Sequence, residues 1–246
     1  MNTDTVKGNS TLLKLTDRYQ HISFGAVTLP VPYFINTAEQ VYKQAMAEAG
    51  IEKDLITKTM QLIKEGKTSL GSVGGKGTPE QITEDLKRLM VDLAEQGYNP
   101  KDSETIRKWM VEMHIGLDCS GYIYNIVSEI EKEQNVEILK HLAWASPESM
   151  KPSHAGAFIF DSEKLKEITN YTDLMPLDIL VRKDYTHVGI LVEIDRALYL
   201  ADCSMGRNGI TFNKTLLTDK ELVIDGYDSW TNHLRDREVV IRRLDF

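Results

Sequence analysis

Two short segments of this chain carry the residue types that acyl-transfer chemistry requires. The first is Asp118-Cys119-Ser120-Gly121, which an apolar pattern typical of a buried helix follows. Cys119 then lies in the first turn of that helix, where free backbone N–H groups and the helix dipole favour thiolate over thiol. Ser120 and Gly121 are small, so we expect an approachable sulfur and N–H groups free to bind an oxyanion. Taken alone, Cys119 also fits a small buried residue.

The second segment places a histidine at the start of a strand with an apolar face. In the run from His187 to Leu191, His187, Gly189 and Leu191 share one face. Sheet hydrogen bonds would hold the backbone of His187, so its ring can be aimed at a fixed point. Gly189 removes side-chain bulk where a substrate chain could pass. The alternative is an ordinary polar residue at the beginning of a strand.

A third polar residue is needed to orient the imidazole and hold its productive tautomer. Asp202 lies 15 residues after His187 and follows an apolar strand, with Asp195-Arg196 as the intervening turn. On paired antiparallel strands this separation can bring the two side chains together. An aspartate that merely begins a loop is the alternative reading.

The elements that must position these residues divide the chain into a helical and a strand-rich half. Thr78-Pro79-Glu80-Gln81 predicts an N-cap, a proline at the first helical position and a capping-box glutamine. Helical patterns cover residues 37–49, 54–65, 78–96 and 103–113. Strand patterns cover residues 157–160, 179–181, 188–194, 197–200 and 239–244. Helices followed by mostly antiparallel strands predict an α+β fold.

Three motifs together resemble those of a known family of cysteine enzymes. Asp118-Cys119-Ser120-Gly121, the turn Pro176-Leu177-Asp178-Ile179 and the segment His187-Val188-Gly189-Ile190 occur in the order found in NlpC-type papain-like peptidases. The resemblance covers roughly residues 105–205. It implies a fold in which a helix starting at the nucleophilic cysteine packs on an antiparallel sheet that carries the histidine.

The resemblance also assigns roles to individual residues. It implies that Cys119 is the nucleophile and His187 the general base. Asp202 falls where the family has a polar third residue, most often histidine, so the aspartate is a departure from the pattern. Residues 1–100 are then a helical N-terminal extension packed on the core, and residues 101–246 form the hydrolase domain.

The expected activity is cysteine-dependent amide hydrolysis, with Asp118, Ser120, Gly121 and Gly189 near the oxyanion or substrate. The resemblance implies peptides or peptidoglycan fragments as substrates and requires no cofactor. Two alternatives stay open. One is another thiol acyl-transfer enzyme, such as a deamidase, a transglutaminase-like enzyme or an acyltransferase. The other is a binding module that keeps the fold without catalysis.

Composition limits the partners and the compartment. The formal net charge is −8 over 246 residues, which argues against nucleic acid as a partner. We expect no integral membrane segment, because apolar runs are too short, and a cytoplasmic protein, because the polar N-terminus does not fit a signal peptide. Removal of a leader or a non-classical secretion route would leave the same sequence. The oligomeric state is not readable from the sequence.

Neither the histidines nor the glycine-rich segment of the chain predicts a ligand site. The six histidines are scattered without metal-ligand spacing, so we expect no metal site. The glycine-rich residues 71–78 do not fit a phosphate loop, because Gly77 rather than serine or threonine follows Lys76. We therefore interpret this segment as a loop ahead of the Thr78 N-cap.

Overall fold

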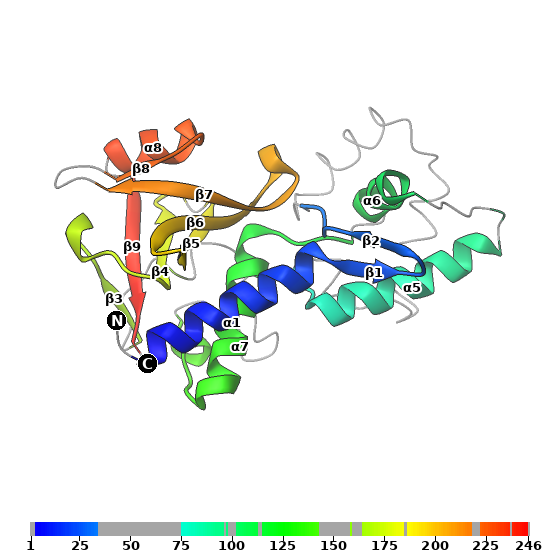
Figure 1. The fold of residues 1–246 in the computed structure, drawn as a ribbon, viewed down its shortest axis with the longest axis horizontal. Helices are drawn as coiled ribbons and strands as arrows, with labels where there is room; N and C mark the ends of the chain where they lie inside the picture. Colours follow the sequence, from blue (N-terminus) through cyan, green and yellow to red (C-terminus); the bar gives the residue numbers. More distant parts are fainter. Residues whose placement is uncertain are drawn as a thin grey trace. The chain divides into compact units, whose positions relative to one another are not determined.

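The protein has a mixed α+β fold, here described from a computed structural model (Figure 1). The structure describes residues 3–33, 75–95, 97, 102–112, 115–142, 158, 164–184, 186–217, 222–236 and 238–245. The helices predicted over 37–49 and 54–65, and the strand over 157–160 apart from Phe158, lie outside these residues.

The chain forms two compact units. The first comprises Met1–Thr16, Cys119–Cys203 and Thr211–Phe246, and the second comprises Asp17–Asp118 and Ser204–Ile210. The predicted division at residue 100 rests on sequence alone. In the structure, residues 1–16 belong to the unit that holds most of the sheet, and residues 102–118 belong to the other unit.

An antiparallel sheet is the framework of the first unit. Its described strands, in spatial order, are β3 (Leu165–Glu167), β9 (Val239–Leu244), β4 (Asp178–Arg182), β5 (Val188–Ile194), β6 (Ala197–Ser204), β7 (Gly209–Leu217) and β8 (Leu222–Ile224). The strand predictions for 179–181, 188–194 and 239–244 are confirmed, and the strand predicted over 197–200 continues to Ser204. Strands β3, β7 and β8 were not predicted.

The hairpin between β5 and β6 fixes the register of the two central strands. Asp195 and Arg196 form its turn with positive φ angles of 50° and 64°. Two positive φ angles are typical of a type I′ turn, whose twist matches that of the flanking strands. Gly189 consequently lies opposite Asp202 in the ladder. The predicted turn is therefore confirmed.

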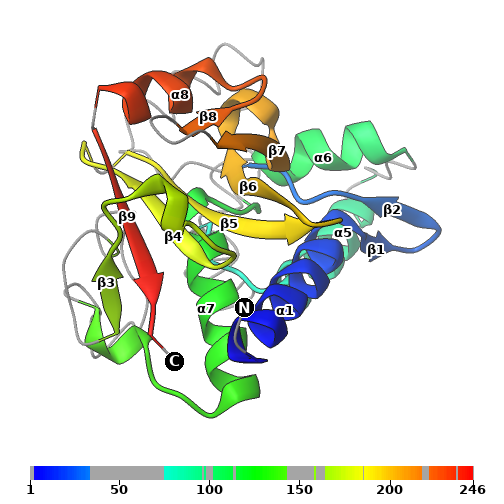
Figure 2. The same cartoon turned by 60° about the vertical axis from the view of Figure 1, so that its left-hand side comes forward.

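One helix that carries the candidate nucleophile packs on the sheet, and the N-terminal helix supports it. α7 (Cys119–Gln134) packs against β5, and α1 (Thr3–Gln20), which was not predicted, runs beside α7 (Figures 1 and 2). The side chain of Asn9 on α1 exchanges hydrogen bonds of 3.1 and 2.8 Å with the backbone of Glu193 on β5. The hydroxyl groups of Thr16 and Tyr122 lie 2.6 Å apart and link α1 to α7.

A second apolar layer includes α8 (Asp228–Arg235), which packs against β8 (Figure 2). The cluster is formed by Leu174, Leu180, Leu191, Leu200, Leu222, Ile224, Trp230, Leu234 and Ile241. Trp230 and Leu234 are the α8 members, and both side chains are buried. This packing matters for the site, because it fixes the indole of Trp230 over the sheet.

The turn that enters β4 is held by a buried ion pair. Asp178 is fully buried, and both of its carboxylate oxygens accept hydrogen bonds from Arg243 on β9 at 2.9 Å. Burial raises the pKa of Asp178, against the hydrogen bonds from Arg243 and the Met175 N–H, which lower it. Leu177, in the same turn, has a φ of 74°. Asp178, a residue of the Pro176–Ile179 motif, therefore has a structural role: it links strand β4 to strand β9.

The second unit contains two helices and a short hairpin. α5 (Pro79–Ala94) packs against β1 (Ile22–Phe24), and α6 (Ser103–Glu112) packs against β2 (Val27–Leu29). The predicted capping box is confirmed, because the Thr78 N–H donates to Gln81 Oε1 at 2.9 Å and the Gln81 N–H donates to Thr78 Oγ1 at 3.3 Å. In the segments described, we find no helix long and apolar enough to cross a membrane.

Candidate active site

Cys119 is the first residue of α7, as predicted, but its environment differs from the expected one. Residues 119–127 are all buried, and Cys119 itself is 6% exposed. The small side chains of Ser120 and Gly121 were expected to leave the sulfur approachable. The first turns of α7 are instead enclosed on every side, so small residues there serve close packing. Only a narrow part of Cys119 reaches the surface.

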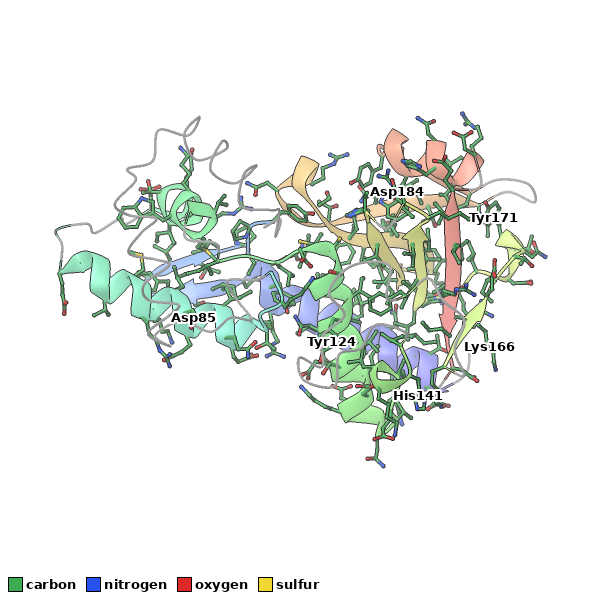
Figure 3. The ribbon with its side chains drawn as sticks, turned by 180° about the vertical axis from the view of Figure 1, so that it is seen from behind. Asp85, Tyr124, His141, Lys166, Tyr171 and Asp184 are labelled. Atoms are coloured by element: carbon green, nitrogen blue, oxygen red, sulfur yellow. The ribbon has the colours of Figure 1, made fainter. Side chains whose placement is uncertain are left out.

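His187 directly precedes β5 and is held by the backbone of the neighbouring strand. The Arg182 N–H of β4 donates to the His187 carbonyl oxygen at 3.0 Å. The turn between these strands is fixed by Asp184, labelled in Figure 3, whose Oδ1 accepts hydrogen bonds from the Thr186 N–H and hydroxyl at 3.1 and 2.7 Å. His187 is 9% exposed, and the nearby Cys119 side chain raises the pKa of its ring.

Asp202 meets the other side of the imidazole. His187 Nε2 lies 2.8 Å from Asp202 Oδ2, and Asp202 is 0% exposed. A carboxylate oxygen accepts, so Nε2 carries a hydrogen, and Nδ1 is the ring nitrogen that Asp202 does not occupy. His187 therefore interacts with both Asp202 and Cys119: it is hydrogen-bonded to Asp202, and Cys119 lies close enough to raise the pKa of the ring.

The charges in this series favour a protonated ring. Burial of His187 opposes its positive charge, but the hydrogen bonds with Asp202 and Cys119 outweigh burial and raise the pKa of His187 to about 9. A buried carboxylate needs a counter-charge or several donors. Of the three side chains that donate to Asp202, only His187 can carry a positive charge. The interactions with Asp202 and Cys119 therefore favour the protonated form of the ring.

Two residues that the sequence did not single out complete the surroundings of Asp202. Trp230 Nε1 donates to Oδ2 at 3.2 Å, and Thr211 Oγ1 donates to Oδ1 at 3.1 Å. The indole also lies against the His187 ring, with centroids 5.4 Å apart and planes tilted by 42°. Asn213 Nδ2 donates in turn to the Thr211 hydroxyl at 3.1 Å. Both carboxylate oxygens are thus fixed by neutral donors as well as by the imidazole.

The sequence contains only weak indications that Thr211 and Trp230 lie beside Asp202. Thr211 and Asn213 alternate along β7, so a polar face one hairpin beyond Asp202 was readable in principle. Nothing in the sequence around Trp230 connects it with a carboxylate 28 residues earlier.

Gly189 has a packing role in the structure. A Cβ at this position would lie 2.8 Å from Leu200 Cδ1 and 3.3 Å from the Ala201 carbonyl oxygen. The missing side chain is therefore explained by the close approach of β6. Passage of a substrate chain beside Gly189 stays a prediction.

Asp118, the residue before Cys119, has a partner that the sequence did not predict. Within the second unit, Lys76 Nζ lies 2.6 Å from both Asp118 Oδ1 and Asp118 Oδ2. Lys76 belongs to the glycine-rich segment that we interpreted as a plain loop. A lysine in a loop and an aspartate 42 residues later carry no sequence pattern that would pair them.

Searches for similar proteins do not add to this picture: no family model, no curated protein and no solved structure matches the chain. Within the parts of the chain that the structure describes, histidine, cysteine and acidic side chains form no group of three or more that could hold a metal ion.

Proposed function

We propose that the protein is a papain-like cysteine hydrolase of the NlpC type, which cleaves amide bonds with Cys119 as nucleophile. The observation that carries the proposal is the series from Cys119 through His187 to the buried Asp202. A cysteine that only packs in a core needs no imidazolium beside it. The buried carboxylate of Asp202 bonds Nε2 of His187, which is the geometry of a group that orients the imidazole.

The first half of the reaction is acylation. The Cys119 thiolate attacks the carbonyl carbon, a C–S bond forms, and the carbonyl electron pair moves to oxygen. Backbone N–H groups at the start of α7 bind that oxyanion, a contribution of about 10²–10³ in rate per donor in other acyl-transfer enzymes. When the oxyanion collapses, the C–N bond breaks and His187 gives its Nδ1 proton to the leaving amine.

The second half is hydrolysis of the thioester. His187, now neutral, accepts a proton from water through Nδ1, and the hydroxide oxygen attacks the thioester carbon. The carboxylic acid leaves as the C–S bond breaks, and the thiolate and imidazolium are restored. Asp202 keeps the ring in one orientation through its bond to Nε2. If an amine replaces water at this step, the same site performs acyl transfer.

Peptide amides, including those of peptidoglycan stem peptides, are the substrate class that we propose. The direct test is digestion of stem-peptide fragments by the wild type and by the Cys119→Ala variant, with product analysis by mass spectrometry. A free amine and a free acid indicate hydrolysis, and a new amide or ester indicates transfer. Products that the Cys119→Ala variant forms equally fast contradict the proposal.

Alkylation with iodoacetamide tests the nucleophile without a substrate. Cys203 is 0% exposed and serves as the internal reference for Cys119. The His187→Gln variant is the matched control, because it leaves the position of Cys119 in α7 and removes the imidazolium. We expect this variant to slow alkylation of Cys119 at about pH 6 by about tenfold or more. An unchanged rate would indicate a binding module that keeps the fold.

A further inference from the structure

Arg182, the last residue of β4, lies opposite the candidate general base. In the β4–β5 ladder Val181 pairs with Val188. The next pair in the same register is Arg182 and His187, and the 3.0 Å hydrogen bond from the Arg182 N–H to the His187 carbonyl oxygen shows that the pairing extends to it. Residues directly opposite each other have Cβ atoms about 4.5–5.5 Å apart on one face of the sheet. The side chains of Arg182 and His187 are therefore neighbours.

Both side chains lie on the sheet face that carries the apolar cluster. Side chains alternate along a strand, so Arg182 shares a face with Leu180, and His187 shares one with Leu191. Leu180 and Leu191 both belong to the cluster that contains Trp230. The indole of Trp230 in turn lies against the His187 ring. All five residues are part of the first unit, so this arrangement is internal to it.

The guanidinium of Arg182 is only partly used by the protein. Its Nη2 donates to Asp184 Oδ2 at 2.7 Å, and the two side chains are 21% and 44% exposed. Its Nε is buried and has no hydrogen-bond partner within the described parts of the chain. An unpaired buried donor costs free energy, and a bound ligand can remove that cost. Arginine offers five N–H donors in a fork that fits a carboxylate with two parallel bonds.

The turn between β4 and β5 does not depend on this arginine. Asp184 Oδ1 already accepts hydrogen bonds from the Thr186 N–H and hydroxyl, at 3.1 and 2.7 Å. An ion pair as exposed as that of Arg182 with Asp184 adds little stability. The pair does show that a carboxylate at the surface of this turn can reach the guanidinium. The position is therefore suited to a carboxylate of a ligand.

We propose that Arg182 binds a carboxylate of the substrate, so that the enzyme prefers peptides with a free carboxylate near the scissile amide. The formal net charge of −8 disfavours the approach of an anionic peptide, and a cation beside His187 offsets this locally. An amide in place of the carboxylate offers no negative charge and a single acceptor oxygen, so the fork discriminates between the two. This inference rests on the proposed function of Cys119 and His187.

The test compares two peptides with three proteins. One peptide is a stem-peptide fragment with a free carboxylate on the residue next to the scissile amide, and the other has that carboxylate amidated. The proteins are the wild type, Arg182→Gln and Lys183→Gln, which removes the same charge from the next, exposed residue. We expect the wild type to favour the free carboxylate by about tenfold or more in kcat/KM. Arg182→Gln should lose this preference mainly through KM, and Lys183→Gln should keep it.

Two further measurements separate the contact from folding and from turnover. Arg182→Lys keeps the charge but not the fork, so it should retain part of the preference, also where Arg182→Gln does not fold. Isothermal titration calorimetry of both peptides with Cys119→Ala, and with Cys119→Ala combined with Arg182→Gln, measures binding without catalysis. We expect the free carboxylate to bind about tenfold or more tightly to the first variant only.

The failure of this inference is distinguishable from the failure of the proposed function. Hydrolysis of both peptides at equal rates by the wild type, or an unchanged preference in Arg182→Gln, overturns the carboxylate site and leaves the proposed function intact. Equal losses for both peptides in Arg182→Gln also overturn the site, because the arginine is then structural. A wild type that hydrolyses neither peptide, although binding still depends on Arg182 and the carboxylate, overturns the proposed function and supports the site. Neither hydrolysis nor such binding overturns both.

Discussion

His187 Nε2 lies 2.8 Å from Oδ2 of Asp202, and the carboxylate is removed from solvent. In this position Asp202 does two things: it orients the ring, and its charge stabilises the protonated form. Orientation needs only an acceptor, whereas stabilisation of the imidazolium needs a negative charge. The two roles can therefore be separated by substitution.

Asp202→Asn keeps an acceptor for Nε2 and removes the charge. We expect the pKa of His187 to fall from its raised value of about 9, because burial then acts against a weaker stabilisation. The basic limb of the pH dependence of kcat/KM should move to lower pH by about one unit or more. Asp202→Ala removes both roles and should reduce kcat/KM further, by about 10²–10³. Identical pH profiles for wild type and Asp202→Asn would contradict this assignment.

Trp230→Phe tests the indole donor while it keeps an aromatic ring in the apolar cluster. Loss of the Nε1–H bond to Asp202 should lower the free energy of unfolding by about 0.5–1.5 kcal/mol and kcat/KM by about three- to tenfold. Thr211→Val is the matched variant on the other oxygen, because valine has nearly the shape of threonine but no hydroxyl. Chemical denaturation and steady-state kinetics measure both effects. Wild-type kinetics in both variants would mean that these donors do not support the carboxylate.

The raised pKa of His187 predicts how stability depends on pH. The folded-state pKa of about 9 exceeds the ordinary value of 6.5, so the folded protein binds the proton more tightly than the unfolded chain. Protonation of His187 therefore adds to the free energy of unfolding. This contribution is fully present below about pH 6.5 and is lost as the pH rises through the folded-state pKa, by at most about 1.4 kcal/mol per pH unit.

The pH dependence of the free energy of unfolding is best measured in the Cys119→Ser variant, because serine does not titrate in this range and the thiol is absent. We expect Asp202, which raises the pKa of His187 in the wild type, to raise it in that variant as well. Urea unfolding between about pH 6 and pH 9.5 should show falling stability in Cys119→Ser and a flatter dependence in Cys119→Ser with His187→Gln. Parallel curves would show that His187 is not the titrating group.

Gly189→Ala tests the close approach of β5 and β6. The added methyl would meet Leu200 Cδ1 and the Ala201 carbonyl oxygen, so we expect a loss of about 1–3 kcal/mol in the free energy of unfolding. Leu200→Ala opens space beside the new methyl. The double variant should therefore be more stable than the sum of the two single losses predicts. Strict additivity would mean that Leu200 is not what excludes a side chain at Gly189.

Local sequence patterns determined those parts of the protein that depend on neighbouring residues. The capping box at Thr78 and Gln81, the beginning of α7 at Cys119 and the turn at Asp195-Arg196 were all predicted and are observed. Each is set by hydrogen bonds or dihedral preferences within a few residues. The β5–β6 register follows from that turn, so the proximity of His187 and Asp202 could also be predicted from the sequence.

Tertiary structure alone decided which distant side chains complete the site. Trp230 reaches Asp202 because α8 packs on the apolar cluster, and Lys76 reaches Asp118 because Gly75 lets a loop approach the backbone closely. The enclosure of Cys119 is likewise a result of packing on all sides of α7. None of these contacts has a fixed spacing along the chain, because packing depends on shape and on where whole elements lie. A sequence names the groups that can react, whereas the fold decides which groups surround them.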